Sequence, residues 1–339
     1  EALGRFGRVE ANPRRAEVAL YHLGNNQLHR DIYRRALREP GVVVLHDAVL
    51  HHFFLGSLDR DSYVEEFVYN YGEWSRELAA GLWAGRARSA QDARYFRYPM
   101  LRRVAEAARA VVVHNPAAAR MVSAHCPGAP VVEIPHLFCP PAMPAAAEVI
   151  RWRRSRGLDS GTFLFGVFGY LRESKRLPAI LRAWRKVKRA GLRVALLVAG
   201  EFSSPDLARA VTPLTDGVLR AGHLPEREFW KLAAATDACL SLRYPAAGET
   251  SGIAVRFMGI GKPVLVTAGE ETAPFPETVC LRVDPGPAEG AMLAEYMTWL
   301  ARFPEAAREI GRRAAAFIGE EHALEAVAAR YWGVLCQCR

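Results

Sequence analysis

Short runs of β-branched and other apolar residues alternate with amphipathic stretches over almost all of the 339 residues of this chain. The alternation predicts parallel β-strands joined by helices, because a parallel pair of strands needs a crossover that is usually helical. The predicted fold class is therefore α/β, with doubly wound parallel sheets. The expected strands cover residues 17–23, 42–45, 110–113, 131–134, 163–168, 194–198, 218–221, 238–242, 263–266 and 279–283. The expected helices cover residues 30–38, 63–80, 101–108, 116–123, 304–317 and 322–335, and others start near residues 177, 205, 226, 250 and 289.

A coil rich in proline and alanine separates two such α/β segments. Three prolines fall within residues 140–144, where neither a helix nor a central strand can continue. We therefore expect a first domain over residues 1–143 and a second over residues 144–318. Residues 319–339 are expected to form a terminal helix that packs back toward the first domain.

Composition limits the class of protein. The chain is 50% hydrophobic and 24% charged, contains no apolar run of about eighteen residues, and has six cysteines without zinc-site spacing. These features predict a cytoplasmic protein with reduced thiols. The net charge of +9 includes an arginine cluster at residues 151–156, which suits a solvated helix face or contact with anionic lipid. Nucleic-acid binding is not expected, because RNA-binding signatures are absent.

One segment of the second domain combines a carboxylate with a helix start. Thr250 or Ser251 can cap a helix that opens at Gly252, and Gly261 followed by Pro263 ends it. The free N–H groups of the first turn and the helix dipole favour an anion there. Glu249, just before the cap, can accept hydrogen bonds from sugar hydroxyls. The alternative is an ordinary capped helix after a strand.

Three further loops follow strands of the second domain, where open α/β sheets bind their ligands. Glycines permit close approach of the backbone in these loops, and two cations can reach a diphosphate. The alternative is that these glycines merely turn the chain. The candidate residues are Gly169, Arg172 and Lys175 in the first loop, Gly200 and Glu201 in the second, and His223 and Leu224 in the third.

The first domain has a polar cluster directly after the strand at residues 42–45. His46 and Asp47 open it, and Asp47 and His51 would share one face if this turn is helical. Two ligands do not make a metal site, so no metal is predicted. The structural alternative is that Asp47 caps a helix and that His51 or His52 packs in the core. Asn25 and Asn26 follow another strand, where their amides can bind acceptor hydroxyls or simply favour a turn.

Three ordered motifs support a family resemblance: residues 165–175 (FGVFGYLRESK), 218–224 (VLRAGHL) and 249–264, which open with Glu-Thr-Ser-Gly. They resemble the donor domain of retaining glycosyltransferases of family 4, in a subgroup with this Glu-Thr-Ser-Gly form. The resemblance implies the GT-B fold, with two Rossmann-like domains facing a central cleft. It also implies that Lys175 contacts the donor phosphates, that His223 and its neighbours face the base, and that Glu249 contacts the transferred sugar. His46 and Asp47 are implied to face the cleft.

The chain departs from that family pattern at three points. Tyr170 stands where the family has Arg, which leaves Arg172 as a stand-in. Arg256 or Phe257 stands near the place of a second Glu, and Arg256 either adds to diphosphate binding or is a surface residue. The opening strand and glycine-rich loop are not found before residue 17, so the first domain is expected to be incomplete at its N-terminus.

The resemblance implies a retaining, metal-independent glycosyltransferase. It would move a hexose-type sugar from a nucleoside-diphosphate sugar to a hydroxyl of a glycan, lipid-linked or small-molecule acceptor. No cofactor is expected beyond this donor substrate, and peripheral attachment to the anionic inner face of a membrane is a further expectation. The alternatives are a nonhydrolysing sugar-nucleotide epimerase and a catalytically silent nucleotide-sugar-binding partner subunit.

Overall fold

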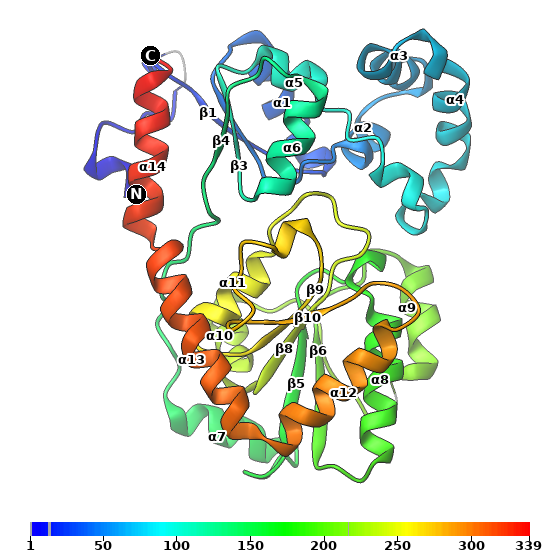
Figure 1. Cartoon of the computed structure of the whole chain (residues 1–339), viewed down its shortest axis with the longest axis vertical. Helices are drawn as coiled ribbons and strands as arrows, with labels where there is room; N and C mark the ends of the chain where they lie inside the picture. The colour runs from blue at the N-terminus through cyan, green and yellow to red at the C-terminus, as the bar shows by residue number, and fades with distance from the viewer. Residues whose placement is uncertain (1, 13–14, 216) are drawn as a thin grey trace. The chain divides into compact units, whose positions relative to one another are not determined.

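The computed structural model describes residues 2–12, 15–215 and 217–339. It contains two all-parallel β-sheets, one of four strands and one of six, each accompanied by helices (Figure 1). The chain divides into two compact units. The first unit comprises Glu1–Leu137, Pro245–Thr250 and His322–Arg339, and the second comprises Phe138–Tyr244 and Ser251–Glu321. The predicted α/β class with parallel sheets is confirmed.

The first unit is built on a sheet whose strands lie in chain order. The strands are parallel and in register, with Leu23 opposite Leu45 and Val44 opposite Val112. The strands are β1 (Leu20–Leu23), β2 (Val42–Leu45), β3 (Ala110–Val113) and β4 (Val131–Glu133). The helices are α1 (Arg30–Arg38), α2 (His51–Ser57), α3 (Arg60–Tyr71), α4 (Arg76–Gly85), α5 (Arg102–Ala107), α6 (Pro116–His125) and α14 (Leu324–Gln337). Short 3-10 turns are η1 (Ala2–Arg5), η3 (Gln27–His29), η4 (Glu73–Ser75), η5 (Arg86–Gln91) and η6 (Ala93–Phe96).

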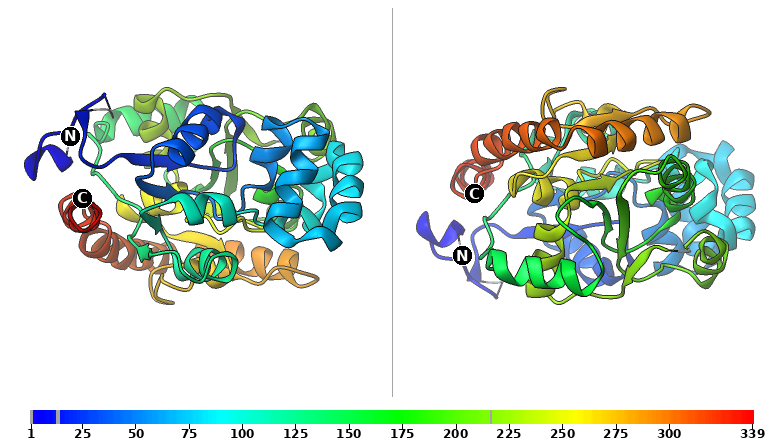
Figure 2. Two further views of the ribbon diagram at one scale, coloured as in Figure 1. Left: turned by 90° about the horizontal axis from the view of Figure 1, so that it is seen from above. Right: turned by 90° about the horizontal axis from the view of Figure 1, so that it is seen from below.

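The two central strands of this sheet, β2 and β3, are buried on both faces. Alternate residues of β2 and β3 point to opposite sides, as the pleat requires. Val43 and Leu45 pack in the larger apolar cluster with the helices between the strands, while Val42 and Val44 pack with α14. The N-terminal segment lies beside α14 in both views (Figures 1 and 2), and Phe6 stacks on Trp332 with ring centroids 6.1 Å apart.

The second unit is built on a six-stranded sheet with the order β10-β9-β8-β5-β6-β7. Its strands are β5 (Phe163–Phe168), β6 (Val194–Ala199), β7 (Leu219–Ala221), β8 (Ala238–Ser241), β9 (Val264–Thr267) and β10 (Leu281–Val283). Its helices are α7 (Ala146–Ser155), α8 (Leu177–Arg189), α9 (Pro205–Val211), α10 (Glu226–Ala235), α11 (Gly252–Gly259), α12 (Glu289–Arg302) and α13 (Pro304–Glu321). Its 3-10 turns are η7 (Glu173–Lys175), η8 (Thr212–Leu214) and η9 (Glu270–Thr272).

The strand order of the second sheet reverses at β5. The chain runs from β5 outward through β6 and β7, and then returns to place β8 on the other side of β5. Such a switch point opens a crevice beyond the carboxyl ends of the two central strands. Phe165 and Leu164 belong to the two separate apolar clusters of this unit, so β5 is covered on both faces.

Several predicted elements differ from the observed ones. The helix predicted at residues 63–80 is two helices, α3 and α4, because Gly72 breaks it with a φ of +91°. The strand predicted from residue 17 begins only at Leu20. Helix α2 was not predicted, because its histidines read as polar although His51 is fully buried. Among the described residues, no helix is both long and apolar enough to cross a bilayer.

Candidate functional site

The loop after β5 brings a glycine and a lysine to the switch point of the second sheet. Gly169 turns the chain with a φ of +87°, which favours glycine, and its N–H donates to the Ala199 carbonyl at 3.0 Å. Lys175 ends η7 and is 5% exposed. Its Nζ donates to the carbonyl of Phe168, the last residue of β5, at 2.5 Å. The ammonium group is therefore fixed at the carboxyl end of the central strand.

The loop after β6 packs its backbone onto the loop after β5. Gly200 has a φ of +140°, and a Cβ at this residue would lie 2.1 Å from the Gly169 carbonyl oxygen. Its N–H donates to the Ala221 carbonyl at the end of β7. Gly200 therefore permits a close approach between strand ends.

The first turn of α11 reaches the same place. Ser251 caps this helix: its Oγ accepts from the Ala254 N–H at 3.3 Å and lies 2.9 Å from Ser241 Oγ. A Cβ at Gly169 would lie 3.3 Å from Lys175 Nζ and 3.5 Å from the Ile253 side chain. The Lys175 ammonium, the Gly169 backbone and the residue after Gly252 are thus close neighbours. A helix start beside a fixed ammonium suits an anion.

Residues that sequence reasoning missed hold the β5 loop in place. Arg176, with a φ of +58°, forms a forked ion pair with Glu289 at 2.6 and 2.9 Å, and Glu289 is almost completely buried. The Tyr244 N–H donates to the Ser174 carbonyl at 2.8 Å. Nothing in the sequence spacing indicates these pairings.

The other donor-side candidates are exposed or lie at the edge of the core. Arg172 is exposed, with its guanidinium 5.5 Å from the Tyr170 ring centre. Arg256 is exposed on α11 and lies over Phe229 of α10, at 5.6 Å. The position of Arg256 favours the surface reading. The loop candidates Glu201 and His223 are exposed, and Leu224 packs at the edge of the core.

The loop Pro245–Thr250 belongs to the first unit, where it is held by backbone and amide contacts. Ala48 N–H donates to the Ala247 carbonyl at 2.8 Å. Asn115 Nδ2 lies 3.0 Å from both the Gly248 carbonyl and Thr250 Oγ1, and Asn115 Oδ1 also caps α6. Within this loop, Glu249 Oε2 accepts from the Ala247 N–H at 2.6 Å.

Histidines line up along the carboxyl edge of the four-stranded sheet. His46 directly follows β2, and its ring lies between those of His22 in β1 and His114 after β3. His46 Nε2 is 3.0 Å from His22 Nδ1, and His46 Nδ1 is 3.1 Å from His114 Nε2. His114 Nδ1 bonds to the Ile134 carbonyl at 2.9 Å. We call His22, His46 and His114 the histidine row.

Partial loss of hydration keeps the histidine row neutral. Loss of hydration, reinforced by repulsion from the neighbouring imidazoles, lowers the pKa of His46 to about 3. Loss of hydration likewise lowers the pKa of His114 to about 4, and it lowers the pKa of His22 although that residue is exposed. At neutral pH each ring therefore carries one N–H and one lone pair.

The polar residues around the row serve the local fold. Asp47 Oδ2 accepts from the Asn25 N–H at 2.7 Å, and Asn25 Oδ1 accepts from the Phe53 N–H. Asn26 Oδ1 caps η3. His51 Nε2 lies 2.7 Å from Tyr63 Oη, within the core. The structural alternatives weighed for Asn25, Asn26 and His51 are thus present, and Asp47 joins two loops rather than capping.

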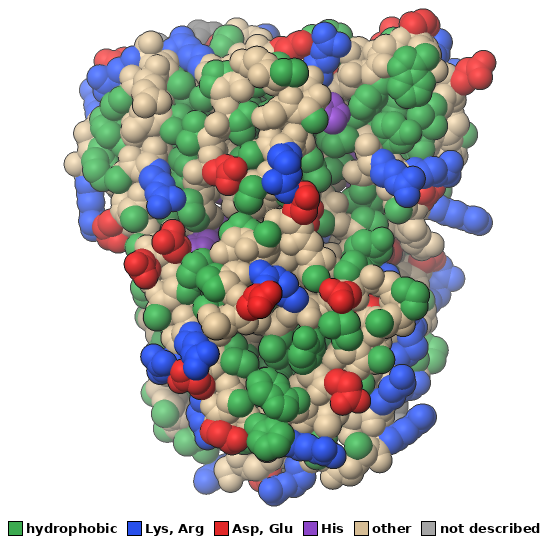
Figure 3. All heavy atoms as spheres, viewed as in Figure 1, with side chains coloured by type: hydrophobic (Ala, Val, Ile, Leu, Met, Phe, Trp, Pro, Cys, Tyr) green, Lys and Arg blue, Asp and Glu red, His purple; other side chains and the backbone are tan. Residues whose placement is uncertain are grey.

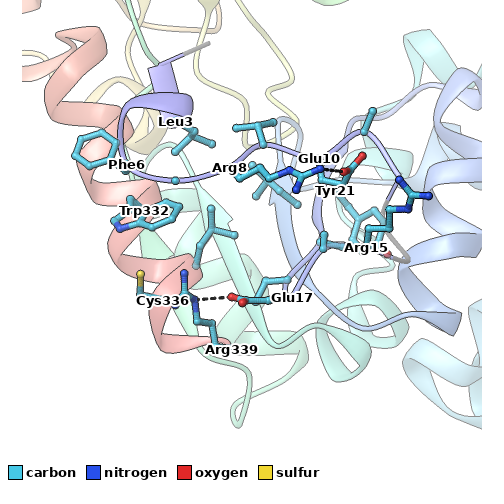
Figure 4. A pocket seen from close by; sticks show the side chains of 18 of the residues that line it. Leu3, Phe6, Arg8, Glu10, Arg15, Glu17, Tyr21, Trp332, Cys336 and Arg339 are labelled. Atoms are coloured by element: carbon cyan, nitrogen blue, oxygen red, sulfur yellow. Dashed lines mark hydrogen bonds and ion pairs between the residues drawn. The ribbon is translucent and has the colours of Figure 1, made fainter.

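In the described part of the chain, no group of three or more His, Cys, Asp or Glu side chains is arranged to hold a metal ion. A hollow of about 950 Å³ lies beside β1, between the N-terminal segment and α14 (Figure 4). His22 lines it together with Leu3, Phe6 and Trp332. Two ion pairs lie at its border, one between Arg8 and Glu10 and one between Arg339 and Glu17.

Solved structures share this arrangement of sheets and helices. HepE of Anabaena, solved in complex with UDP-glucose, matches over 94% of this chain and 78% of its own, with TM-score 0.69 and 16% identity. Sucrose-phosphate synthase of Thermosynechococcus elongatus matches over 96% and 75%, with TM-score 0.67 and 15% identity. WaaG, a glycosyltransferase involved in lipopolysaccharide biosynthesis, matches over 95% and 78%, with TM-score 0.61 and 14% identity. The chain has the GT-B fold.

The predicted GT-B fold is therefore confirmed, and at these identities the likeness concerns the fold. No protein-family model and no curated protein sequence matches the chain. In this GT-B chain the six-stranded sheet carries Lys175 and the start of α11, and the four-stranded sheet carries the histidine row. The Glu-Thr-Ser-Gly subgroup stays a prediction.

Proposed function

We propose that this GT-B chain is a retaining glycosyltransferase that moves a hexose-type sugar from a nucleoside-diphosphate sugar to an acceptor hydroxyl. One observation carries the proposal: the Lys175 ammonium, the Gly169 backbone and the first turn of α11 are close neighbours at a topological switch point. Solved relatives lend support, because HepE was crystallised with UDP-glucose and with UDP and glucose.

The chemistry follows from where negative charge develops. When the bond between the sugar and the diphosphate breaks, the electron pair stays on the diphosphate. Lys175 and the amides of the α11 start would stabilise that charge in a partly dehydrated site, without reorganising during the reaction. Because these groups supply positive charge themselves, we propose that transfer needs no metal ion. Excess EDTA should then leave the rate unchanged.

Glu249 and the residues after β2 are assigned to the sugar. Glu249 would orient the transferred sugar by accepting hydrogen bonds from its hydroxyls, and His46 with Asp47 would form the sugar-facing side of the first unit. The remaining donor candidates, Arg172 and His223, are exposed and free to contact diphosphate and base. The acceptor is proposed to be a glycan, a lipid-linked glycan or a small molecule.

Attachment to an anionic membrane is proposed from charge alone. The chain carries a net charge of +9, although basic and acidic side chains are interspersed on the face shown in Figure 3. Arg153 of the predicted basic cluster turns inward to pair with Asp237. Sedimentation with phosphatidylglycerol vesicles at low salt tests the proposal, and a protein that stays in the supernatant contradicts it.

The proposed function is tested with a panel of donors. The protein is heated with UDP-glucose, GDP-mannose or UDP, and the protecting nucleotide sugar is then assayed for slow hydrolysis. A rise in Tm with one nucleotide sugar and release of its sugar with retained anomeric configuration is expected. Protection without turnover would instead indicate a catalytically silent binding subunit, and no protection by any donor would overturn the proposal.

A further inference from the structure

Three neighbouring strands each deliver one histidine to the same face of the four-stranded sheet. His22, His46 and His114 lie two residues after Leu20, Val44 and Val112, which pack in the apolar cluster under α14. Because side chains alternate along a strand, residues two apart share a face. The histidine row therefore continues this buried face at the carboxyl edge of the sheet.

A single backbone carbonyl sets the direction of every hydrogen bond in the row. The Ile134 carbonyl can only accept, so His114 Nδ1 carries the proton and His114 Nε2 is an acceptor. His46 Nδ1 must then donate to His114, which leaves His46 Nε2 to accept from His22 Nδ1. All three neutral rings are fixed as the Nδ1–H tautomer.

His22, at the end of the row, is the one ring of the three with a nitrogen that is hydrogen-bonded neither to another ring of the row nor to the Ile134 carbonyl. Both ring nitrogens of His46 and of His114 are engaged. His22 uses Nδ1 toward His46, is exposed, and lines the hollow beside β1. The Nε2 atom of His22 therefore carries a lone pair and can accept a hydrogen bond. The Ile134 carbonyl fixes this state through the rings of His114 and His46.

We propose that Nε2 of His22 accepts a hydrogen bond from a sugar hydroxyl, and that His46 and His114 are positioning residues that fix its tautomer. The identity of the ligand as a sugar rests on the proposed function, whereas the tautomers do not. The hydroxyl comes either from the donor sugar or from the acceptor. An imidazole held in the Nδ1–H form admits a hydroxyl donor and rejects a group that can only accept.

The tautomers are tested first, on the protein without ligand. In ¹⁵N-histidine spectra at pH 7, His22, His46 and His114 should each show a protonated Nδ1 and a bare Nε2, opposite to the form that free histidine prefers. His114→Gln keeps a donor toward Ile134 and an acceptor toward His46, so it should preserve the His46 and His22 tautomers. His114→Leu removes both groups and should return them to Nε2–H. A protonated Nε2 on His22 in the unaltered protein overturns the proposal.

The ligand is tested second, with UDP, UDP-glucose and glucose as probes. A change in the His22 Nε2 resonance with UDP-glucose but not UDP assigns the hydroxyl to the donor, and a change with glucose alone assigns it to the acceptor. His22→Leu should weaken binding of the probe that changes this resonance about 3- to 10-fold, and it should leave the affinity for UDP unchanged. If UDP-glucose protects the protein against heat but neither UDP-glucose nor glucose moves this resonance, the proposal fails while the proposed function stands.

Discussion

The backbone of Gly200 packs onto the carbonyl group of Gly169, so closely that a Cβ atom at residue 200 would lie 2.1 Å from that oxygen. The φ of +140° at Gly200 adds a second requirement for glycine. Contact between these two glycines joins the ends of β5 and β6 directly through their backbones. The position of Gly169 beside Lys175 and α11 therefore depends on a residue in another loop.

Replacing Gly200 should damage both stability and nucleotide binding. Gly200→Ala forces the two loops apart and places a side chain at an unfavourable φ, so we expect a loss of about 2 kcal/mol of unfolding free energy. UDP affinity should fall with it. Gly128→Ala is the matched control, because residue 128 lies outside the candidate loops, a Cβ there would meet no atom within 4 Å and the φ there is not positive. Urea denaturation and UDP titration are carried out on both variants. Equal free energies of unfolding and equal UDP affinities would show that the close contact between Gly200 and Gly169 is not needed.

The protein should lose stability when Glu289 is removed, because the loop after β5 is held by the ion pair between Arg176 and Glu289. Glu289→Ala leaves the half-buried Arg176 guanidinium without its almost completely buried carboxylate, which should destabilise the protein by about 2 kcal/mol. The double variant Arg176→Met with Glu289→Leu should recover part of this loss, because neither charge is then stranded. A double variant as unstable as the sum of the single variants would rule out this explanation.

Glu249 should matter for turnover and little for folding. Glu249→Gln removes the charge that is proposed to orient the sugar, and a misplaced sugar costs on the order of 10²-fold in rate. Donor hydrolysis and thermal unfolding are the measurements. Glu305→Gln, at the exposed start of α13, controls for loss of a surface carboxylate. An unchanged rate for Glu249→Gln would show that the assignment is wrong.

The histidine row should make the free energy of unfolding depend on pH. Because the folded pKa values of His46 and His114 lie near 3 and 4, below the ordinary value, the unfolded chain binds more protons between about pH 4 and 6.5. The contribution of the neutral imidazoles to the free energy of unfolding is present above about pH 6.5. It is lost as the pH falls from about 6.5 to 4. The groups facing the row are the imidazoles of His29, His136 and His322, so no carboxylate among these neighbours offsets the effect.

The acid dependence is measured as urea unfolding at a series of pH values. The free energy of unfolding should decline from pH 6.5 to pH 4, and His114→Gln should flatten the decline because one buried imidazole is gone. His223→Gln, at an exposed residue, should leave the slope as it is. Equal slopes for all three proteins would contradict the lowered pKa values of the histidine row.

Local sequence signals predicted much of the fold. The strands β2, β3 and β5 were predicted from their apolar runs. Helices α6, α8 and α9 begin with a proline in the first turn. Both signals act within a few residues. The prediction for residues 63–80 failed because the break at Gly72 depends on a single positive φ inside an otherwise helical pattern. Helix α2 was missed because burial of His51 requires Tyr63 as a partner.

The candidate site could be predicted only where it depends on strand ends. Lys175 and the Ser251 cap follow predicted strands, so they could be placed together in advance. Arg176 and Glu289 are 113 residues apart, and only the packing of α12 on α8 brings them together. Of the histidine row, only His46 was assigned a role from the sequence, although His22 and His114 also stand at the ends of predicted strands. Their neighbourhood depends on the strand order, which the sequence did not indicate.

The central claim is that a nucleoside diphosphate binds through its phosphates at Lys175 and the start of α11. Calorimetric titration of UDP and of uridine into the unaltered protein, Lys175→Met and Lys186→Met tests it most directly, since Lys186 is exposed on α8. We predict that Lys175→Met weakens UDP binding about 10- to 100-fold, leaves uridine binding unchanged, and that Lys186→Met alters neither. UDP affinity that is equal in Lys175→Met and the unaltered protein would contradict the account.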